Sequence, residues 1–408
     1  MHILFLTDNF PPEVNAPASR TYEHCREWVS AGCNVTVITC APNFPKGRVY
    51  DGYQNRLWSE EFVEGIRVIR VWSYITANEG FVKRVLDYQS FMVSAVIGSF
   101  FVRQVDLVVG TSPQFFTACA GWFVGFAKRV PFVFELRDIW PESIKAVGAM
   151  SDSFAIRMLE RVEMFLYKKC SLIISVTHAF KDKLIKRGVD ESKIEVVTNG
   201  VDMSRFRPME KDAQLLRDLN LEGKFVAGYV GTHGLAHHLE TILDAAEILA
   251  SDPDGEKFHF MLLGDGARKA ALQEDAAKRG LSNITFVDSV SKDDVARYWS
   301  VLNVSIIHLK KTELFTSVIP SKLFECMGMG IPVLHGVEGE SAAIVQDTDV
   351  GIVFEPESAD ELVMYLKELA LSEDRYAGYR SRCLAAAKVF DRKALAMKML
   401  QCLRRVAQ

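Results

Sequence analysis

The chain has 408 residues, of which 49% are hydrophobic and 25% are charged, and its formal net charge is −4. Its length exceeds what one hydrophobic core usually holds, so we expect two domains of ordinary globular composition. The slightly acidic balance excludes a general nucleic-acid binder, because such a protein needs a basic footprint.

The cysteines and the N-terminus bear on the compartment. The eight cysteines are scattered and include no C-x-x-C pair. This pattern is typical of free thiols in a reducing cytoplasm and not of a disulfide framework or a zinc site. The apolar start, Met1 to Asp8, is too short for the hydrophobic region of a signal peptide and predicts a first strand. We therefore expect a cytoplasmic protein.

The first elements of the chain predict an α/β fold. A buried strand is expected over His2 to Thr7, a helix from about Arg20 to Ala31, and a second strand over Asn34 to Thr39. This order makes a right-handed βαβ unit, which begins a doubly wound parallel sheet. No G-x-G-x-x-G motif follows the first strand, so we predict no dinucleotide cofactor.

Two aromatic and basic segments suggest a membrane contact. Phe81 to Arg103 is the most apolar helical segment, but Asp87 and Gln89 interrupt it, so it does not predict a membrane span. It is either a core helix or a helix that lies on a membrane surface. Trp122 to Arg129 repeats the aromatic and basic character, and we therefore favour a peripheral membrane contact.

A candidate catalytic pair follows the strand Val130 to Leu136. Ligands of open α/β sheets bind beyond the carboxyl ends of the strands, where Arg137 and Asp138 stand. Arg137 can stabilise developing negative charge, and Asp138 can orient a hydroxyl or accept its proton. The alternative is an ion pair that braces the loop, and the position favours function.

The C-terminal half repeats the strand–helix pattern after a turn-rich link at Asn199 to Asp202. Two sheets of similar type, one in each half, are therefore expected to face each other across a cleft. Three histidines, His233, His237 and His238, follow one of the strands without a carboxylate or cysteine at ligand spacing, so we predict no metal. Histidines in such a turn more often cap a helix or bind a phosphate.

Two further polar positions follow later strands. Gly264 to Gly266 either forms a tight strand-to-helix turn or lies near a ligand. Asp288 directly follows the strand Ile284 to Val287, where it either accepts a hydrogen bond from a base or ribose or only begins a loop.

The stretch Ser317 to Met329 predicts a short helix that starts at Pro320, Ser321 and Lys322. A helix start offers free N–H groups and a positive dipole end, which favour a phosphate, and Lys322 adds a cation. Glu325 lies one turn further on and suits the hydroxyls of a ribose. The pattern therefore predicts a nucleoside diphosphate, or alternatively a capped surface helix with an internal ion pair.

The ordered set of motifs resembles the family 4 retaining glycosyltransferases of the GT-B fold. The resemblance spans nearly the whole chain and rests on these segments: Asn199-Gly-Val-Asp202 with Phe206, Gly231-Thr-His-Gly234, Leu263-Gly-Asp-Gly266, Pro320-Ser-Lys-Leu-Phe-Glu325 and Gly330-Ile-Pro-Val333. Within the family, Arg137 to Ser143 and Tyr229 to Ala236 look like a bacterial surface-polysaccharide branch that includes N-acetyl-L-fucosamine (6-deoxy-HexNAc) transferases of O-antigen assembly.

The resemblance implies transfer of a sugar from a UDP-sugar, with retention at the anomeric carbon and with no metal or other cofactor. The acceptor implied is a saccharide on undecaprenyl diphosphate at the inner face of the plasma membrane. The implied domains are an acceptor domain over 1–188, a donor domain over 189–385, and a helix over 386–408 that returns to the first domain.

The resemblance also implies site residues. Implied catalytic residues are Arg137, Asp138 and Lys322. Implied donor contacts are Gly231, Thr232, His233, His237, Gly264, Val287, Asp288, Pro320, Ser321, Lys322, Leu323 and Glu325. Implied acceptor contacts are Asn15, Ala16, Pro17, Ser19 and Arg20.

Several positions depart from the family pattern. Ser317 stands eight positions before Glu325, where the family has a second glutamate. The diphosphate loop carries histidines where the family has Arg and Lys, so more of the phosphate charge falls on Lys322. The family's His aligns with Arg137, and its Gly-Gly in the first loop is replaced by Asn15-Ala-Pro17. Two alternative functions follow, a UDP-sugar 2-epimerase or hydrolase of the same fold and a non-catalytic nucleotide-sugar-binding scaffold.

Overall fold

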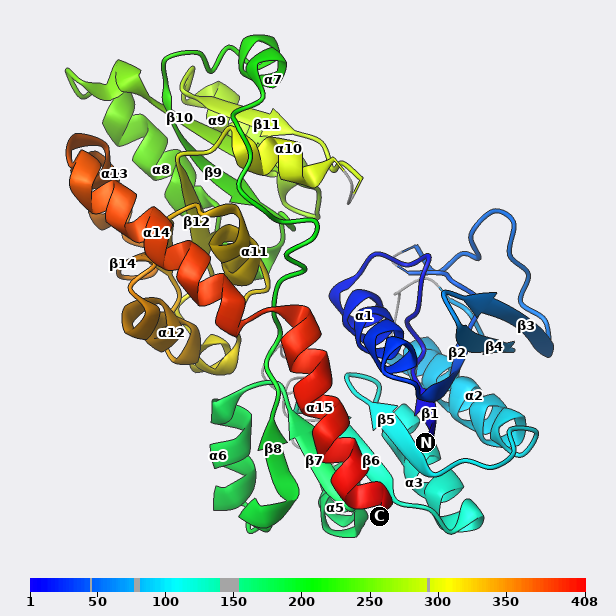
Figure 1. Ribbon diagram of the computed structural model, residues 1–408. Coiled ribbons are helices and arrows are strands. Elements are labelled where there is room, and N and C mark those ends of the chain that lie inside the picture. Colours follow the sequence, from blue (N-terminus) through cyan, green and yellow to red (C-terminus); the bar gives the residue numbers. More distant parts are fainter. Residues whose placement is uncertain (45, 77–80, 140–153, 292–293) are drawn as a thin grey trace. The chain divides into compact units, whose positions relative to one another are not determined.

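The computed structural model describes residues 1–44, 46–76, 81–139, 154–291 and 294–408 (Figure 1). Trp140 to Ser143 of the predicted surface-polysaccharide motif lie outside these residues. The chain forms two compact units, Met1–Thr198 with Arg392–Gln408 (unit 1) and Asn199–Asp391 (unit 2).

The first boundary between the units lies ten residues later than the predicted position after 188. The reason is the strand β8 (Ile194–Val196), which pairs with β7 (Leu172–Ser175) and so completes the sheet of unit 1. The second boundary follows Asp391, and α15 (Arg392–Ala407) belongs to unit 1.

Unit 1 is built on one sheet. Among its described residues eight strands pair in the order β3-β4-β2-β1-β5-β6-β7-β8, parallel except for the antiparallel pair β3 and β4. The remaining strands are β1 (His2–Leu6), β2 (Asn34–Cys40), β3 (Trp58–Val63), β4 (Ile66–Val71), β5 (Leu107–Thr111) and β6 (Phe132–Leu136). The central strands are buried along their whole length, as expected when helices cover both faces of a parallel sheet.

Helices cover the sheet of unit 1. They are α1 (Ala16–Ser30), α2 (Phe81–Ser99), α3 (Phe115–Lys128), α5 (Phe154–Lys169), α6 (His178–Lys186) and the C-terminal α15. The first helix begins four residues earlier than predicted, because the Asn15 side chain accepts the N–H of Ala18 and caps it. The C-terminal helix lies along α1 (Figure 1), and the Trp28 indole donates to the carbonyl of Ala396 at 2.9 Å.

The two aromatic and basic segments form α2 and part of α3, helices that carry apolar residues on both their buried and their exposed sides. Phe91 and Ala95 of α2 are buried in the core of unit 1, whereas Val93 and Ile97 of the same helix are exposed. The helix therefore takes part in the core and also presents apolar side chains to the outside. No described helix combines the length and hydropathy that crossing a bilayer requires.

Unit 2 carries a second sheet. Its described strands pair in parallel in the order β11-β10-β9-β12-β13-β14. Their bounds are β9 (Phe225–Val230), β10 (Phe258–Leu263), β11 (Ile284–Val287), β12 (Val304–His308), β13 (Val333–Gly336) and β14 (Gly351–Val353). The predicted α/β class, with a doubly wound parallel sheet in each half, is confirmed.

The helices of unit 2 follow the strands in turn. They are α7 (Ala213–Asp218), α8 (Glu240–Ala250), α9 (Lys269–Lys278), α10 (Val295–Ser300), α11 (Lys322–Met329), α12 (Glu340–Thr348), α13 (Ala359–Leu371) and α14 (Glu373–Val389). In each sheet the strand order reverses once, between β1 and β5 in unit 1 and between β9 and β12 in unit 2. Open α/β sheets bind ligands beyond the carboxyl ends of the strands at such a reversal.

Candidate functional site

At the reversal in unit 2, Lys322 from the start of α11 lies on the aromatic ring of Tyr229 from β9. The Lys322 Nζ is 3.6 Å from the centre of that ring. A β-carbon added at Gly231, directly after β9, would come 2.9 Å from the same Nζ. Glycine therefore leaves the room that the lysine occupies. The Tyr229 hydroxyl donates to the carbonyl of Thr232 at 2.9 Å and so fixes the ring.

In this position the ammonium group of Lys322 loses its proton more easily than it does in water. Burial lowers the pKa of Lys322 to about 7, and nearby Cys326 and Glu325 only partly oppose this effect. An approaching phosphate would stabilise the ammonium form, because an opposite charge within a few ångströms raises the pKa of an amine. The lysine is thus suited to gain its charge together with an anionic ligand.

The start of α11 differs from the prediction in one respect. The helix begins at Lys322, and Ser321 stands at its N-cap without a side-chain hydrogen bond. The N–H groups of Leu323 and Phe324 already donate to the carbonyls of Pro320 and Ser321, at 3.0 and 3.1 Å. These two N–H groups are therefore not free donors, which shortens the predicted row of N–H groups at the helix start.

Glu325 and Ser317 stand at the two positions where the family pattern has glutamates. Glu325 is partly buried in the first turn of α11, next to Lys322 in the helix start. Its contact with a ribose stays a prediction. Ser317, which replaces the family glutamate, ends the 3-10 turn Glu313–Ser317, and its hydroxyl donates to the carbonyl of Leu314 at 3.4 Å.

Glycines bring two loops of unit 2 together. Gly231, Gly264 and Gly266 have φ angles of +143°, +148° and +155°, which side chains rarely allow. A β-carbon at Gly264 would lie 1.9 Å from the Gly231 carbonyl oxygen, and one at Gly266 would lie 2.5 Å from the carbonyl oxygen of His233. The turn at Gly264 to Gly266 is thus required by contact with the loop after β9, and not only by its own geometry.

The predicted histidines lie in this loop as neutral rings. Burial, with Lys269 and Lys322 adding to it, lowers the pKa of His233 to about 4, and burial and Lys322 lower that of His237 equally far. Neither ring nitrogen of His233 has a hydrogen-bond partner among the described residues, nor does Nδ1 of His237. No three His, Cys, Asp or Glu side chains in the described parts of the chain are grouped as a metal site would need.

The sequence reasoning missed a buried cation, Lys269, at the start of α9. Its Nζ donates to the carbonyls of Gly264 and Val287, at 2.8 and 3.3 Å, and contacts an Asp288 carboxylate oxygen at 2.5 Å. The lysine ties the carboxyl ends of β10 and β11 together. Lysines on amphipathic helices are usually exposed, so the sequence held no signal for this contact.

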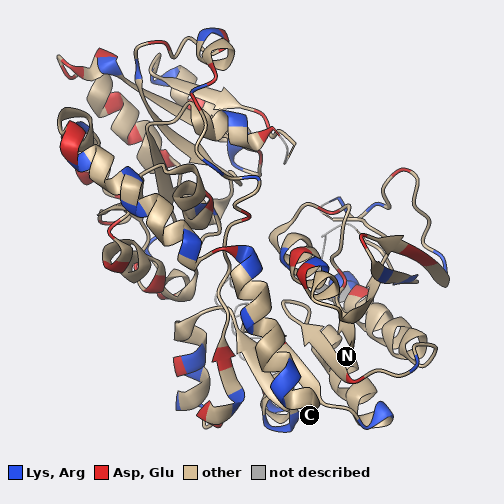
Figure 2. Ribbon diagram, viewed as in Figure 1, with Lys and Arg blue, Asp and Glu red and all other residues tan. Residues whose placement is uncertain are grey.

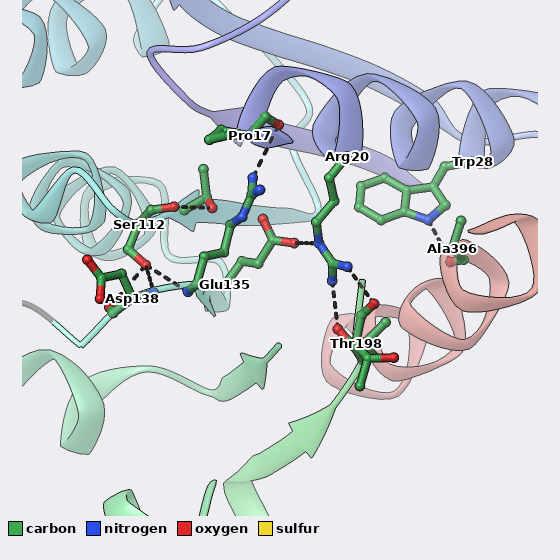
Figure 3. Close-up of polar contacts among 11 residues, drawn as sticks. Pro17, Arg20, Trp28, Ser112, Glu135, Asp138, Thr198 and Ala396 are labelled. Carbon is green, nitrogen blue, oxygen red and sulfur yellow. Dashed lines mark hydrogen bonds and ion pairs between the residues drawn. The ribbon is translucent and has the colours of Figure 1, made fainter. Parts of the chain in front are cut away.

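In unit 1, Arg137 and Asp138 follow β6 as predicted. Their backbone N–H groups donate to the Ser112 hydroxyl, at 2.8 and 3.1 Å, and one guanidinium nitrogen of Arg137 donates to the Pro17 carbonyl at 3.2 Å (Figure 3). Burial lowers the pKa of Arg137 to about 10, although Glu135 opposes the shift. Arg137 therefore keeps its positive charge at neutral pH.

The predicted acceptor residue Arg20 is directed into unit 1. Its guanidinium contacts Glu135 at 2.8 Å and donates to the carbonyls of Val197 and Thr198, at 2.8 and 2.6 Å (Figure 3). Arg20 and Glu135 are both buried. These contacts join α1, β6 and the two residues that follow β8, which is a structural role.

The sequence of each unit matches a family model. Residues 18–205 match "Glycosyltransferase Family 4", and residues 224–371 match "Glycosyl transferases group 1". The chain is a family 4 glycosyltransferase of GT-B type.

Relatives match this glycosyltransferase over nearly all or about half of its length. The putative colanic acid biosynthesis glycosyl transferase WcaI of Escherichia coli is 25% identical over 91% of the chain and 92% of its own length. The amylovoran biosynthesis glycosyltransferase AmsK of Erwinia amylovora is 24% identical over 51% of the chain and 49% of its own length.

Solved structures share the fold of the glycosyltransferase at low sequence identity. Anabaena HepE in complex with UDP and glucose is 18% identical, with a TM-score of 0.72 over 98% of this chain and 99% of that chain. WaaG, a glycosyltransferase of lipopolysaccharide biosynthesis, is 15% identical, with a TM-score of 0.67 over 97% of this chain and 98% of that chain.

The structure brings only some predicted site residues of the glycosyltransferase together. In unit 2, the loop after β9, the glycine turn after β10, Asp288 and the start of α11 all lie at the carboxyl edge of the sheet. In unit 1, Asn15 and Pro17 line a polar cavity. Ala16 is exposed, the Ser19 hydroxyl donates to the Asn15 carbonyl, and Arg20 points into the core.

Proposed function

We propose that this glycosyltransferase moves a sugar from a UDP-sugar to a lipid-linked saccharide in bacterial surface-polysaccharide biosynthesis, with retention at the anomeric carbon. The donor sugar is an N-acetylated or 6-deoxy amino sugar such as N-acetyl-L-fucosamine. The names of WcaI, AmsK and WaaG, which refer to colanic acid, amylovoran and lipopolysaccharide, support the pathway class. HepE, bound to UDP and glucose, supports the nucleotide.

The observation that carries the proposal is the position of Lys322 above Tyr229, beside the glycine turn of unit 2. When the glycosidic bond to the nucleotide breaks, negative charge grows on the departing diphosphate. A cation already placed at that point lowers the barrier, because it interacts more strongly with the transition state than with the ground state. The same phosphate accepts the proton of the acceptor hydroxyl on the face that it leaves, which gives retention without an enzymatic nucleophile.

An apolar groove in unit 1 supports a membrane-bound acceptor. It measures about 370 Å³, lies between α2, α3 and α5, and has only apolar or sulfur-containing lining side chains: Met92, Val93, Val96, Ile97, Cys119, Ala120, Trp122, Phe123, Val162, Phe165 and Leu166. Exposed basic residues stand close to it in sequence, Arg129 after α3 and Lys168 and Lys169 at the end of α5 (Figure 2).

This combination fits an anionic bilayer as the occupant of the groove. Acyl or isoprenoid chains would cover the apolar side chains, and the basic residues would contact lipid phosphates. Trp122 forms part of the groove and packs edge-on against Phe165 at 4.8 Å between ring centres. A tryptophan at this place is typical of protein surfaces that lie at the membrane interface.

An assay with UDP-sugars and an undecaprenyl-diphosphate-linked saccharide tests the proposal. We expect UDP release only when both are present, and a product whose anomeric proton coupling in NMR matches that of the donor. UDP release without acceptor would indicate the epimerase or hydrolase alternative. Measurable UDP binding without turnover of any donor would indicate the scaffold alternative, and an inverted product would contradict the retaining mechanism.

A further inference from the structure

The chain passes between the two units twice, after Thr198 (the first crossing) and after Asp391 (the second crossing). On the unit 2 side the two crossing segments pair with each other. The N–H of Val201 donates to the carbonyl of Phe390 at 2.9 Å, and Val201 forms a parallel bridge with Asp391. Residues 197–201 and 390–392 therefore form one two-stranded link, because a backbone hydrogen bond joins the two segments.

In unit 1, one helix contacts both strands of the link. The guanidinium of Arg20 on α1 donates to the carbonyls of Val197 and Thr198, the last two residues before the first crossing (Figure 3). Glu23 on the same helix pairs with Arg392, the first residue after the second crossing, and their side chains are only 9% and 18% exposed. Residues three positions apart lie on the same side of a helix, so one side of α1 holds both strands.

In unit 2, the helix that carries Lys322 at its start packs on the other end of the link. The rings of Phe324 on α11 and Phe390 are 4.8 Å apart between their centres. A β-carbon added at Gly328 of α11 would come 2.9 Å from Cγ2 of Val201, so glycine allows the helix this close. Phe324 and Val201 are fully buried. The helix α11 therefore rests on both strands of the link.

The two helices also carry predicted substrate residues at their starts. The Asn15 side chain caps α1, and the Pro17 carbonyl in the first turn accepts from Arg137. Asn15 and Pro17 are predicted acceptor contacts, as Lys322 is a predicted donor contact at the start of α11. Each printed contact in this series lies within one unit, and the peptide bonds of the two crossings join the two sides.

We propose that the link couples donor binding at the start of α11 to the position of the predicted acceptor residues at the start of α1, with Glu23 and Phe390 as positioning residues. Neither residue touches a substrate: Glu23 acts through Arg392, and Phe390 acts through Phe324. That the two ligands are a sugar donor and a saccharide acceptor rests on the proposed function, whereas the coupling of the two helices does not.

The physical reason is the packing at both ends of the link. Packed interfaces shift between discrete arrangements and do not deform smoothly, so a displacement of α11 passes to the segments that it touches. Contiguous contacts by themselves do not establish such coupling, which needs a measurement on each side. If the contacts only stabilised the link locally, a substitution in one unit would affect that unit alone.

Hydrogen exchange of the ligand-free, full-length chain makes this measurement. Glu23→Gln keeps an oxygen for Arg392 but removes the charge of the pair, and it should speed exchange in α11 of unit 2. Phe390→Leu should speed exchange in α1 of unit 1. The internal comparison is α8, whose buried side chains belong to a different core cluster from those of α11 and whose exchange should stay unchanged.

The matched control for Glu23→Gln is Glu195→Gln. Glu195 pairs with Arg405 at 2.6 Å and also joins α15 to the rest of unit 1, but the pair includes no residue of the link. This variant should change exchange in unit 1 only. Faster exchange confined to the substituted unit in both Glu23→Gln and Phe390→Leu would overturn the proposal, and equal speeding of α8 and α11 would do so too.

Saturating UDP separates this inference from the donor proposal. In the native chain UDP should slow exchange in α11 and in α1, and in both variants it should slow α11 alone. Slower exchange in α11 without any change in α1 of the native chain would overturn the coupling and leave the donor site intact. No effect of UDP on α11 would count against the donor site, and the ligand-free comparison would still decide the coupling.

Turnover distinguishes a positioning role from a purely structural one. Glu23→Gln should lower kcat about tenfold with a nearly unchanged KM for the donor, because a small misplacement of the reacting groups far from the substitution is costly. Glu195→Gln should leave both constants unchanged. A native kcat per folded molecule in Glu23→Gln would show that its pair with Arg392 only stabilises unit 1, and would overturn the positioning role.

Discussion

The ammonium of Lys322 lies 3.6 Å above the centre of the Tyr229 ring. A buried ammonium group is usually paired with a carboxylate, and here an aromatic face takes that place. A cation over an aromatic face gains about 0.5–2 kcal/mol, which is less than burial of a charge costs. The pKa of about 7 expresses this deficit. Lys322 thus lowers the stability of the free protein and becomes favourable once an anion binds.

Substitution of Lys322 tests this relationship through two opposite effects. Lys322→Met should weaken UDP binding about tenfold or more, because a hydrogen bond to a charged group contributes about 1.5–3 kcal/mol. The same variant should melt a few degrees higher in the absence of ligand, since about 1 kcal/mol corresponds to about 2–4 °C in a unit of this size. Calorimetric titration and thermal melting measure the two effects. Lys257→Met, in an exposed pair with Asp254, is the control, and unchanged UDP affinity in Lys322→Met would contradict the site.

The pH dependence of UDP binding follows from the same pKa. Below about pH 7 the free protein already carries the charge on Lys322, and above it binding must bring in a proton. UDP affinity should therefore fall as the pH rises from 7 to 9, with proton uptake visible when calorimetry is repeated in buffers of different ionisation enthalpy. Lys322→Arg, which stays charged, should remove the uptake. Affinity that is flat over this range in the native chain would contradict the prediction.

The lowered pKa of Lys322 affects folding and UDP binding in opposite directions: the stability of the free protein rises with pH, whereas UDP affinity falls. The folded-state pKa of Lys322 lies below its usual value of 10.5, so the unfolded chain binds more protons between about pH 7 and 10.5. The destabilisation by Lys322 is thus complete below pH 7 and disappears as the pH approaches 10.5. The stability gain of Lys322→Met should shrink in parallel when melting is measured across this range.

Glu325 offers a test of nucleotide orientation. If its carboxylate accepts hydrogen bonds from the ribose, Glu325→Gln should weaken UDP binding, whereas an analogue without the ribose hydroxyl should be less affected. A cycle of native and variant protein with UDP and its 2′-deoxy and 3′-deoxy analogues isolates this contact. The same loss of affinity for all three ligands would exclude a ribose contact by Glu325.

The large features of the fold were readable in the sequence because they rest on local patterns. Continuous apolar runs such as His2 to Thr7 predicted buried parallel strands, and both sheets contain them. Element ends were less predictable. The side chain of Asn15 caps α1 four residues before the predicted start, and β8 extended unit 1 beyond residue 188, because both depend on contacts that periodicity does not encode.

The candidate site could be predicted in part, because some of its residues also stand in local sequence patterns. Lys322 and Gly231 stand beside a helix start and a strand end, which are recognisable positions. The contacts of Lys269 were not found, since its partners lie at the carboxyl ends of β10 and β11 and not in its own helix. The resemblance implied an acceptor contact for Arg20, but only the fold shows that Arg20 pairs with Glu135.

The buried pair of Arg20 and Glu135 predicts a stability effect. Removal of one partner from a buried ion pair costs about 3–5 kcal/mol, because the other charge is left without compensation. Glu135→Gln should therefore speed hydrogen exchange in β6 and α1, and Arg20→Met combined with Glu135→Leu should recover part of the protection. A change in acceptor KM for Arg20→Met without faster exchange would instead place Arg20 in the acceptor site.

The apolar groove of unit 1 makes a prediction about membranes. Phe126→Ser should weaken binding to anionic vesicles, since transfer of a phenylalanine side chain from water contributes about 1.5–3 kcal/mol. Phe126 does not line the groove itself, but its ring stacks on that of the lining residue Trp122, at 5.9 Å between ring centres. Phe62 is the matched control, because it is 71% exposed against 72% for Phe126 and lies on β3, which contributes no lining residue to the groove. Lys168→Gln with Lys169→Gln should reduce binding by about 1 kcal/mol for each lysine, and only at low salt. Equal flotation of Phe62→Ser and Phe126→Ser would show that the groove does not meet the bilayer, because general surface hydrophobicity would then explain the binding.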